Sequence, residues 1–235
     1  MTRRIAIIPA RGGSKRIPRK NVREFCGKPM IGHILETARE SGLFDVIHVS
    51  TESPEVRAKV EKLGFAIDFP RPDHLADDFT PIMPVLKYVA EQYVARGKRF
   101  DEVWLLMACA PLIESSDLKE AADLFARSPG ERAVLAVSAY PVPIEWAYSR
   151  AGDGALSPLQ PGMFAKRSQD IEKKYFDTGT FCALPSAMVL GSEGAGSDTG
   201  FTGYVLDKDK AIDIDDDEDW ALAEVMFHSR NKVSR

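Results

Sequence analysis

A short apolar run that opens into a basic, glycine-containing loop constrains this chain more than any other feature. Residues 5–10 read Ile-Ala-Ile-Ile-Pro-Ala, a pattern typical of a buried strand that ends at proline. The next eleven residues carry no acid and five cations, namely Arg11, Lys15, Arg16, Arg19 and Lys20. Like charges at this density repel one another unless an anion lies among them. The pattern therefore indicates an anion-binding loop after a buried strand.

Two glycines, Gly12 and Gly13, follow the first arginine of this loop. Glycine adopts positive φ without strain and lets backbone N–H groups approach a ligand closely, so we expect the pair to cradle a polyphosphate with Ser14 and Asn21. The alternative is a solvated basic loop with an ordinary turn, which leaves the buried strand before it unexplained. The spacing matches neither G-x-x-x-x-G-K-[ST] nor G-x-G-x-x-G, which argues against a Walker loop and a dinucleotide cofactor.

Composition narrows the class of protein further. The chain has 235 residues, with 31 Lys and Arg against 35 Asp and Glu, so the basic loop is a local patch and general nucleic-acid binding is not expected. The sequence contains no apolar run of about eighteen residues and no leader before the first strand, so we expect no membrane partner. Scattered cysteines indicate reduced thiols in a cytoplasmic protein and argue against a zinc site: Cys26, Cys109 and Cys182. The length suits one domain, residues 1–235.

Strand and helix patterns alternate along the chain. After the first strand, strand patterns occur at 46–51, 65–69, 103–109, 133–139, 175–184, 204–206 and 211–215. Helical spacing occurs at 30–39, 54–63, 81–95, 116–127 and from 217 onward. Alternation of this kind requires βαβ crossovers, so we predict an α/β fold with a mostly parallel sheet. From about 140 to 170 the periodicity fades among prolines and glycines, and we expect an arm used for dimer contacts.

Two aspartates, Asp213 and Asp215, alternate with isoleucines late in the chain. Alternate side chains of a strand share a face, so this pattern points both carboxylates in one direction. Such a pair suits Mg²⁺, which prefers oxygen ligands and keeps several waters. Ligands of open α/β sheets bind beyond the carboxyl ends of the strands, so we expect this pair to meet the basic loop over one polyphosphate. The alternative, capping of the last helix, fits Asp217 and Glu218 better.

A third polar cluster contains Arg167, Gln169 and Asp170, with Tyr175 and Asp177 downstream. Arginine offers a fork that binds a carboxylate, and the amide and acid can bind hydroxyl groups. A solvated surface run is an equally good interpretation of these residues taken by themselves.

The run I-P-A-R-G-G-S-K-R-I-P-R-K-N at residues 8–21 resembles the signature of the acylneuraminate cytidylyltransferases, which make CMP-activated nonulosonic acids. Shorter motifs follow in the family's order over nearly the whole chain: Arg71-Pro72, Leu75-Ala76-Asp77-Asp78, Ala110-Pro111-Leu112, Arg167-Ser168-Gln169-Asp170 and Asp213-Ile214-Asp215. The resemblance implies a Rossmann-like α/β domain of the nucleotide-diphospho-sugar transferase type. It also implies a homodimer in which a mid-chain arm reaches the partner.

Within this family, R-S-Q-D-I-E at 167–172, followed by Tyr175 and D-T-G at 177–179, is most similar to the pseudaminic acid branch. Sialic acid synthetases more often carry R-R-Q-D, and a glutamine where Met107 stands. CMP-N-acetylneuraminate synthesis, or synthesis of another CMP-keto-sugar acid, stays open as an alternative. A 3-deoxy-manno-octulosonate cytidylyltransferase and a sugar-1-phosphate pyrophosphorylase would carry different first loops. A non-catalytic nucleotide-binding homologue is a further alternative, although it would not need the pair Asp213 and Asp215.

The resemblance also implies roles for individual residues. The substrates would be CTP and a nine-carbon keto-sugar acid, whose anomeric hydroxyl attacks the α-phosphorus. Arg11, Lys15 and Lys20 would hold the triphosphate, helped by the backbone of Gly12 and Gly13, and Asp213 and Asp215 would hold Mg²⁺. Arg11, Lys20 and Asp215 are the expected catalytic residues, and the general base stays open between Asp215 and a hydroxide on the metal. Cytidine would contact Ala10, Asn21, Arg71 and Thr80, and the sugar acid would contact Arg167, Gln169 and Asp177.

Overall fold

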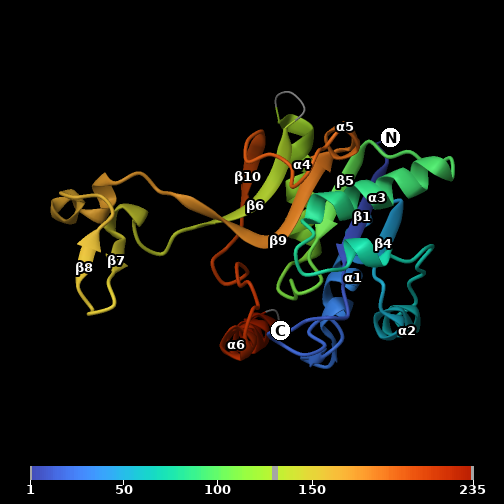
Figure 1. Ribbon diagram of the computed structural model, residues 1–235, viewed down its shortest axis with the longest axis horizontal. Coiled ribbons are helices and arrows are strands. Elements are labelled where there is room, and N and C mark those ends of the chain that lie inside the picture. The colour runs from blue at the N-terminus through green and yellow to red at the C-terminus, as the bar shows by residue number, and fades with distance from the viewer. Residues whose placement is uncertain (1, 129–131, 234–235) are drawn as a thin grey trace.

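The computed structural model describes residues 2–128 and 132–233 and contains a central sheet of six strands (Figure 1). The strands lie in the order β10-β6-β9-β5-β1-β4. Their bounds are β1 Arg4–Pro9, β4 Val46–Ser50, β5 Glu102–Leu106, β6 Ala133–Ala139, β9 Tyr175–Pro185 and β10 Phe201–Val205. The connecting helices are α1 Met30–Ser41, α2 Pro54–Lys62, α3 Ile82–Ala95, α4 Ser115–Arg127, α5 Ser186–Leu190 and α6 Asp217–Val233.

Strand pairing confirms the predicted α/β class. β1 runs parallel to both β4 and β5, and β6 runs parallel to β10. β9 is antiparallel to β5 and β6, and it brings the chain back into the middle of the sheet after the excursion near 140–170. The parallel arrangement directs the carboxyl ends of β1, β4 and β5 to the same edge of the sheet, where loops can form a site.

Both faces of β1 are buried, as its unbroken apolar run predicts. Ala6 and Ile8 pack in a core with α1, α2 and α4, and Ile5 and Ile7 pack in a second core with α3 and α5. All four side chains are fully buried. Since the basic loop leaves the end of this strand, its first residues start from a rigid position.

Two predicted strands are wrong, at 65–69 and 211–215, because neither stretch forms ladder hydrogen bonds. Phe65 and Ile67 are buried in the first core and Phe69 in the second, so the alternation reflects packing of an irregular segment beside the sheet. Residues 211–215 are irregular too, and only Ile214 of this stretch is fully buried. The pattern thus predicted which side chains turn inward and missed the lack of a partner strand.

A third, smaller core joins the two ends of the chain. Ile17 from the basic loop and Phe25 from β2 (Glu24–Phe25), which pairs with β3 (Lys28–Pro29), pack against Ile214 and against Trp220 of α6. In Figure 1, α6 correspondingly lies beside the N-terminal loop. This core holds the basic loop and the segment of the predicted metal-binding aspartates against each other.

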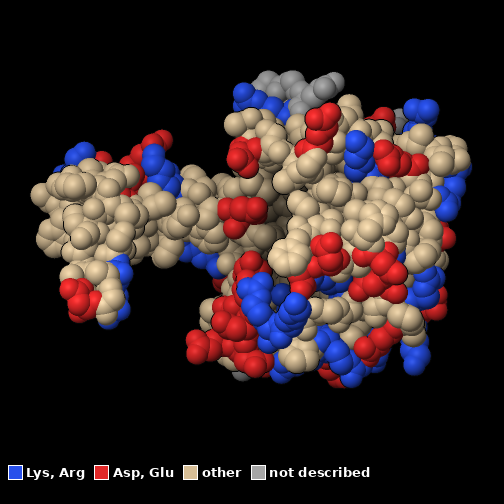
Figure 2. Space-filling view, in the orientation of Figure 1, with Lys and Arg blue, Asp and Glu red and all other residues tan. Residues whose placement is uncertain are grey.

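Residues 140–174 leave the body of the molecule as an arm (Figure 1). Its end carries a small hairpin of β7 Tyr148–Arg150 and β8 Leu156–Pro158, flanked by short 3₁₀ turns at Ile144–Trp146, Met163–Ala165 and Ser168–Asp170. Much of the arm surface is uncharged in Figure 2, and Phe164 is 83% exposed. No helix in the described part of the chain has the length and apolar character needed to cross a bilayer.

Candidate active site

A cleft of about 700 Å³ opens beyond the carboxyl ends of β1 and β5. Its walls come from the basic loop after β1, from the segment 71–80 before α3, and from Met107, Ala108 and Cys109 after β5. Asp213 and Asp215 line it from the C-terminal part of the chain. The predicted meeting of the basic loop and the acidic pair is therefore present in the structure, at the edge of the sheet where ligands of open α/β folds bind.

Most of the basic loop faces this cleft. Five of its predicted ligand-binding residues line it: Arg11, Ser14, Lys15, Lys20 and Asn21. Arg16 lines it too, and its Nη1 lies 2.6 Å from Asp215 Oδ2. Arg19, the fifth cation, instead pairs with Glu55 at the start of α2. The loop therefore directs four of its five positive charges toward one space.

The two glycines act differently from the prediction. Neither has a positive φ, which in the described loop occurs only at Arg19, at 58°. The Gly12 N–H donates to Glu52 Oε1 over 2.7 Å, so it is already used inside the protein. A Cβ at Gly12 would lie 2.9 Å from the Ser53 side chain, whereas one at Gly13 would meet nothing within 4 Å. Gly12 is thus required for close packing of the loop on residues 52–53, and neither glycine lines the cleft.

Acidic side chains neutralise the cations of the cleft. Arg11 Nη1 lies 2.5 Å from Asp78 Oδ1 and 3.1 Å from the Asp77 carbonyl oxygen, and Lys15 also pairs with Asp78. These cations lower the pKa of the Asp78 carboxyl, Lys15 more than Arg11. Lys20 Nζ donates to the Ile214 carbonyl oxygen over 2.6 Å and lies 3.6 Å from Asp215. The protein carboxylates thus occupy positions beside cations that could bind phosphate oxygens.

The pair Asp213 and Asp215 faces the cleft although its segment is not a strand. Ile214 between them packs in the third core, and both aspartates line the cleft. Burial and the nearby Asp215 raise the pKa of Asp213. A Cβ at Gly179, which has a φ of 62°, would lie 3.3 Å from Asp213 Oδ2, so the glycine in β9 leaves room for this carboxylate.

These two carboxylates fit a hard divalent cation. Their mutual repulsion and partial burial raise the energy of two negative charges, and a cation between them would relieve it. Among the described residues, no group of three or more His, Cys, Asp or Glu could hold a metal ion. A cation here would take its other ligands from water and substrate, which is the way Mg²⁺ is commonly bound. The burial-raised pKa of Cys109 keeps the neighbouring thiol protonated.

Of the residues expected around cytidine, three line the cleft and one supports it. Arg71 is buried, and its guanidinium donates to Ser50 Oγ over 3.1 Å and to the Ser50 carbonyl oxygen over 2.7 Å. Asn21 donates to the Arg11 carbonyl oxygen over 2.9 Å, and Thr80 follows the Asp77 turn. Ala10 is fully buried and its N–H donates to Ser50, so it lies beneath the cleft.

The three residues expected to bind the sugar acid do not lie together in the described chain. Arg167 and Gln169 are on the arm, exposed, and Arg167 pairs with Asp170 over 2.8 Å. Asp177 lies in β9, where its carboxylate accepts the Gly179 N–H over 2.9 Å. Among the described residues that line the cleft, neither Arg167 nor Gln169 of the same chain is present.

Sequence reasoning assigned no role to two features of this site. Asp78 pairs with the phosphate-site cations, and Phe79 beside it lines the cleft while being 92% exposed. The adjacent acids in Leu-Ala-Asp-Asp were a visible signal. Their partner Arg11, which binds the Asp77 carbonyl oxygen and the Asp78 carboxylate, is 66 and 67 residues away in sequence. The charge match between the acidic run and the basic loop was the available indication.

Comparison with known proteins defines the class. Residues 5–139 match the model of the cytidylyltransferase family, so the chain belongs to that family and is a nucleotidyltransferase. A solved CMP:2-keto-3-deoxy-manno-octonic acid synthetase, complexed with CTP, shares the fold with a TM-score of 0.73 at 16% identity. That match covers 97% of this chain and 100% of the other.

Relatives of known activity narrow the class to enzymes that activate acidic sugars. The chain is 31% identical over 229 residues to the pseudaminic acid cytidylyltransferase of Campylobacter jejuni, covering 95% of each protein. It is 27% identical over 229 residues to the CMP-N,N'-diacetyllegionaminic acid synthase of Legionella pneumophila, again covering 95% of each. These matches confirm the family that the loop motif indicated.

Proposed function

We propose that this enzyme transfers CMP from CTP to the anomeric hydroxyl of a nonulosonic acid, with pseudaminic acid as the favoured sugar, and releases pyrophosphate. The relative in Campylobacter jejuni is named for this sugar, and the R-S-Q-D-I-E motif agrees with that branch. The observation that carries the proposal is the convergence of the basic loop and the acidic pair on one cleft. Lys20 and Ile214, 194 residues apart in sequence, are joined there by a hydrogen bond.

The cleft suits phosphoryl transfer because that chemistry depends on positioning and on neutralising charge. Arg11, Lys15 and Lys20 would bind the triphosphate of CTP, and phosphate oxygens would replace Asp78 as the partner of Arg11 and Lys15. With the α-phosphorus held in this way, the sugar hydroxyl attacks in line and pyrophosphate leaves toward the cations of the loop. Arg16, which lies beside Asp215, adds a fourth cation to the same space.

Asp213 and Asp215 would hold Mg²⁺, which would supply Lewis-acid stabilisation of charge on the phosphate oxygens. Lys20 keeps this pair close to the basic loop through the Ile214 carbonyl oxygen. Asn21, Arg71 and Thr80 would surround the nucleoside, where the buried guanidinium of Arg71 fixes one wall.

We assign Arg167 and Gln169 to the sugar acid of a second copy of the chain. Both lie on an arm that extends away from the body (Figure 1), and the arm exposes apolar side chains suited to a protein contact, including Val142, Leu156, Leu159 and Phe164. A homodimer in which each arm reaches the partner's cleft would complete both sites. A cytoplasmic location agrees with the three free cysteines and with the need for CTP.

Pyrophosphate release tests the proposal directly. The protein is incubated with CTP and Mg²⁺ and with pseudaminic, legionaminic, N-acetylneuraminic or 3-deoxy-manno-octulosonic acid. Release with pseudaminic acid at a kcat/KM at least about tenfold above the others is the expected result. Preference for another of these acids would keep the reaction and correct the sugar. No release from any of them, while CTP still binds, would support a non-catalytic nucleotide-binding protein.

A further inference from the structure

Lys210 is a buried cation outside the cleft, and its ammonium group contacts carboxylates. Its side chain is 5% exposed, and Nζ lies 2.7 Å from both oxygens of Asp117 and 2.8 Å from Glu114 Oε2. Asp117 is itself only 8% exposed. A lysine is rarely buried unless it is paired, so this position has a specific requirement for a long cation.

The partners of Lys210 form the first turn of α4. Asp117 Oδ2 accepts the Glu114 N–H over 2.8 Å, and the two acids form a capping box at the start of the helix. Lys210 therefore bonds to side chains whose positions the helix already holds. Burial opposes the charge of Lys210, but its bonds to Asp117 and Glu114 raise its pKa, so the lysine stays charged at neutral pH.

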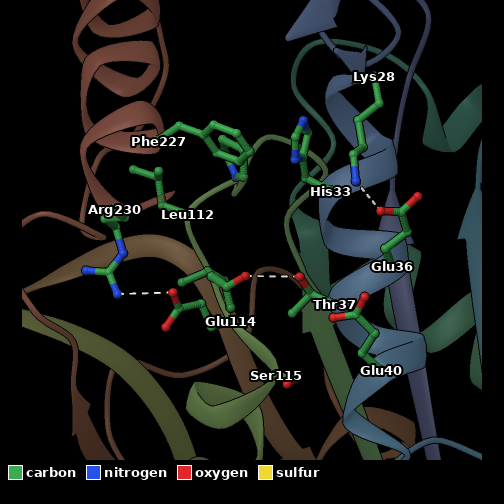
Figure 3. A pocket seen from close by; sticks show the side chains of 12 residues that line it. Lys28, His33, Glu36, Thr37, Glu40, Leu112, Glu114, Ser115, Phe227 and Arg230 are labelled. Carbon is green, nitrogen blue, oxygen red and sulfur yellow. Dashed lines mark hydrogen bonds and ion pairs between the residues drawn. The ribbon is translucent and has the colours of Figure 1, made fainter. Parts of the chain in front are cut away.

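The same ion pairs reach the last helix. Arg230 of α6 lies 3.2 Å from Glu114 and 2.5 Å from Asp209, the residue before Lys210. Figure 3 shows Arg230 and Glu114 on one side of a cavity of about 330 Å³, with Lys28, Glu36 and Thr37 on its opposite side. The cavity is bordered by charged groups that already bind one another: Glu36 pairs with Lys28, and Glu114 pairs with Lys210 and Arg230. This surface consequently anchors residues 209–210 between α4 and α6.

Lys210 is three residues before Asp213, in a segment that has no ladder hydrogen bonds. On the C-terminal side of Asp213, Ile214 packs in the third core. The N–H groups of Asp215 and Asp216 donate to Asp219 of α6 over 2.9 and 3.2 Å. The two anchors leave Asp213 between them, against Gly179. Loss of either anchor would let the carboxylate move while the sheet stays intact.

We propose that Lys210 is a positioning residue for the reaction: through Asp117 and Glu114 it fixes the segment that presents Asp213 and Asp215 to the cleft. The proposal rests on the proposed function, because it gives the two aspartates the task of holding the metal. Lys210 also links α4 to the metal-binding aspartates, because Lys210 bonds to the two acids that cap this helix.

The test compares four variants with the wild-type protein. Lys210→Met removes the charge, Lys210→Arg restores it, and Asp117→Asn weakens the partner while retaining a capping oxygen. Arg4→Met is the matched control, because it breaks another largely buried ion pair, to Glu102 at the opposite end of β1. Three properties are measured: amide hydrogen exchange over 207–216, Mn²⁺ binding by electron paramagnetic resonance, and the Mg²⁺ concentration that half-saturates pyrophosphate release.

Lys210→Met is expected to speed exchange of residues 211–216, to weaken Mn²⁺ binding and to raise the half-saturating Mg²⁺ concentration, each by about tenfold or more. Asp117→Asn should change the three measured properties in the same direction. If Lys210→Met does not fold, Asp117→Asn provides the test. Lys210→Arg should return them to within about threefold, and Arg4→Met should lower the melting temperature while leaving all three near wild type.

Wild-type exchange and Mn²⁺ binding in Lys210→Met or Asp117→Asn would overturn the proposal and leave Lys210 a purely structural ion pair. Wild-type protein that releases no pyrophosphate with any sugar acid would instead refute the proposed function. In that case exchange and Mn²⁺ binding would still decide whether Lys210 positions the two aspartates.

Discussion

Asp213, which we assign to the proposed metal site, is expected to lower the stability of the folded protein at neutral pH. Burial and the charge of Asp215 raise the pKa of Asp213, so the folded protein favours its neutral form. The neutral carboxyl therefore contributes to the free energy of unfolding at low pH, and this contribution is lost as pH rises through the raised pKa. Asp213→Asn supplies a neutral side chain of the same shape. We expect turnover to fall by about 10²-fold or more, while the melting temperature at pH 7 stays equal to or above that of the wild type.

Calorimetry at pH 7 and pH 4, together with pyrophosphate release, checks this prediction. The stability difference should shrink at pH 4, because the raised pKa of Asp213 leaves a larger share of the wild-type carboxyl groups protonated there than at pH 7. A variant with turnover within a few-fold of the wild type would remove the metal assignment. A clear loss of stability at pH 7 would contradict the repulsion between the two carboxylates.

Lys20 and Arg19 are adjacent cations with different surroundings, and they form a matched pair. The Lys20 side chain is 16% exposed and binds the Ile214 carbonyl oxygen in the cleft, whereas the Arg19 side chain is 64% exposed and pairs with Glu55. Lys20→Ala should lower kcat/KM for CTP by about 10²-fold or more, because it removes a phosphate-site cation and an anchor of the acidic segment. Arg19→Ala should change it by less than about threefold. Equal effects of the two substitutions in steady-state assays would show that loop charge in general, and not cleft position, sets the activity.

Residue patterns predicted which side chains share the cleft better than they predicted its internal contacts. The cations of the basic loop and the alternation of Asp213 with Asp215 were sufficient to expect one shared site, because both patterns are local. The partners Glu52 and Asp78 were not predictable, since their bonds to Gly12 and Arg11 span 40 and 67 residues. Such contacts depend on how separate loops fold back over β1, which short sequence windows do not encode.

At the scale of elements, most predicted helices and strands are present, and the two wrong strands share a cause. Residues 65–69 and 211–215 alternate as strands do, but Phe65 and Ile214 fill cores without a neighbouring strand to pair with. Apolar alternation reports which side chains are buried, whereas a ladder also requires an available edge. The prediction that Asp213 and Asp215 lie on one side agrees with the structure, where both line the cleft, because it depended only on the first of these properties.

β4 carries a histidine whose protonation links stability to pH. His48 is 1% exposed and stacks on Phe69, and its Nδ1 lies 3.2 Å from the Tyr93 hydroxyl of α3. Burial lowers its pKa to about 4, and the buried Nε2 has no partner in the described structure. As pH falls from about 6.5 toward 4, His48 is therefore protonated in the unfolded chain and stays neutral in the folded chain. We expect this group to contribute about 2 kcal/mol less stability at pH 5 than at pH 7.

Urea denaturation of the wild type and of His48→Asn at pH 7 and pH 5 isolates this contribution. Asparagine retains a polar atom near the position of Nδ1 and does not titrate, so the variant should lose about 2 kcal/mol less than the wild type on acidification. Identical losses in the two proteins would show that other groups control stability in this range.

At the scale of the whole molecule, the arm separates the candidate sugar-binding residues from the cleft of their own chain. The fading periodicity at 140–170 was sufficient to predict an excursion, but a linear pattern does not give its direction. In the structure the arm leads away from the body (Figure 1). Leu159 and Phe164 on the arm are exposed. The proposed nucleotide and metal sites thus lie within one chain, whereas the proposed role of Arg167 and Gln169 requires another copy.

This division of labour predicts complementation between two inactive proteins. Arg167→Ala damages the arm and Asp215→Ala damages the cleft, so a mixed dimer has one site with both defects and one site with neither. Refolding the two variants together in equal amounts should restore roughly a quarter of the wild-type activity, since half of the dimers are mixed and one of their two sites is intact. Pyrophosphate release before and after co-refolding measures the gain, and sedimentation confirms the dimer. If the mixture stays as inactive as its components although mixed dimers form, Arg167 acts in the cleft of its own chain. The arm would then serve the site of the chain that carries it.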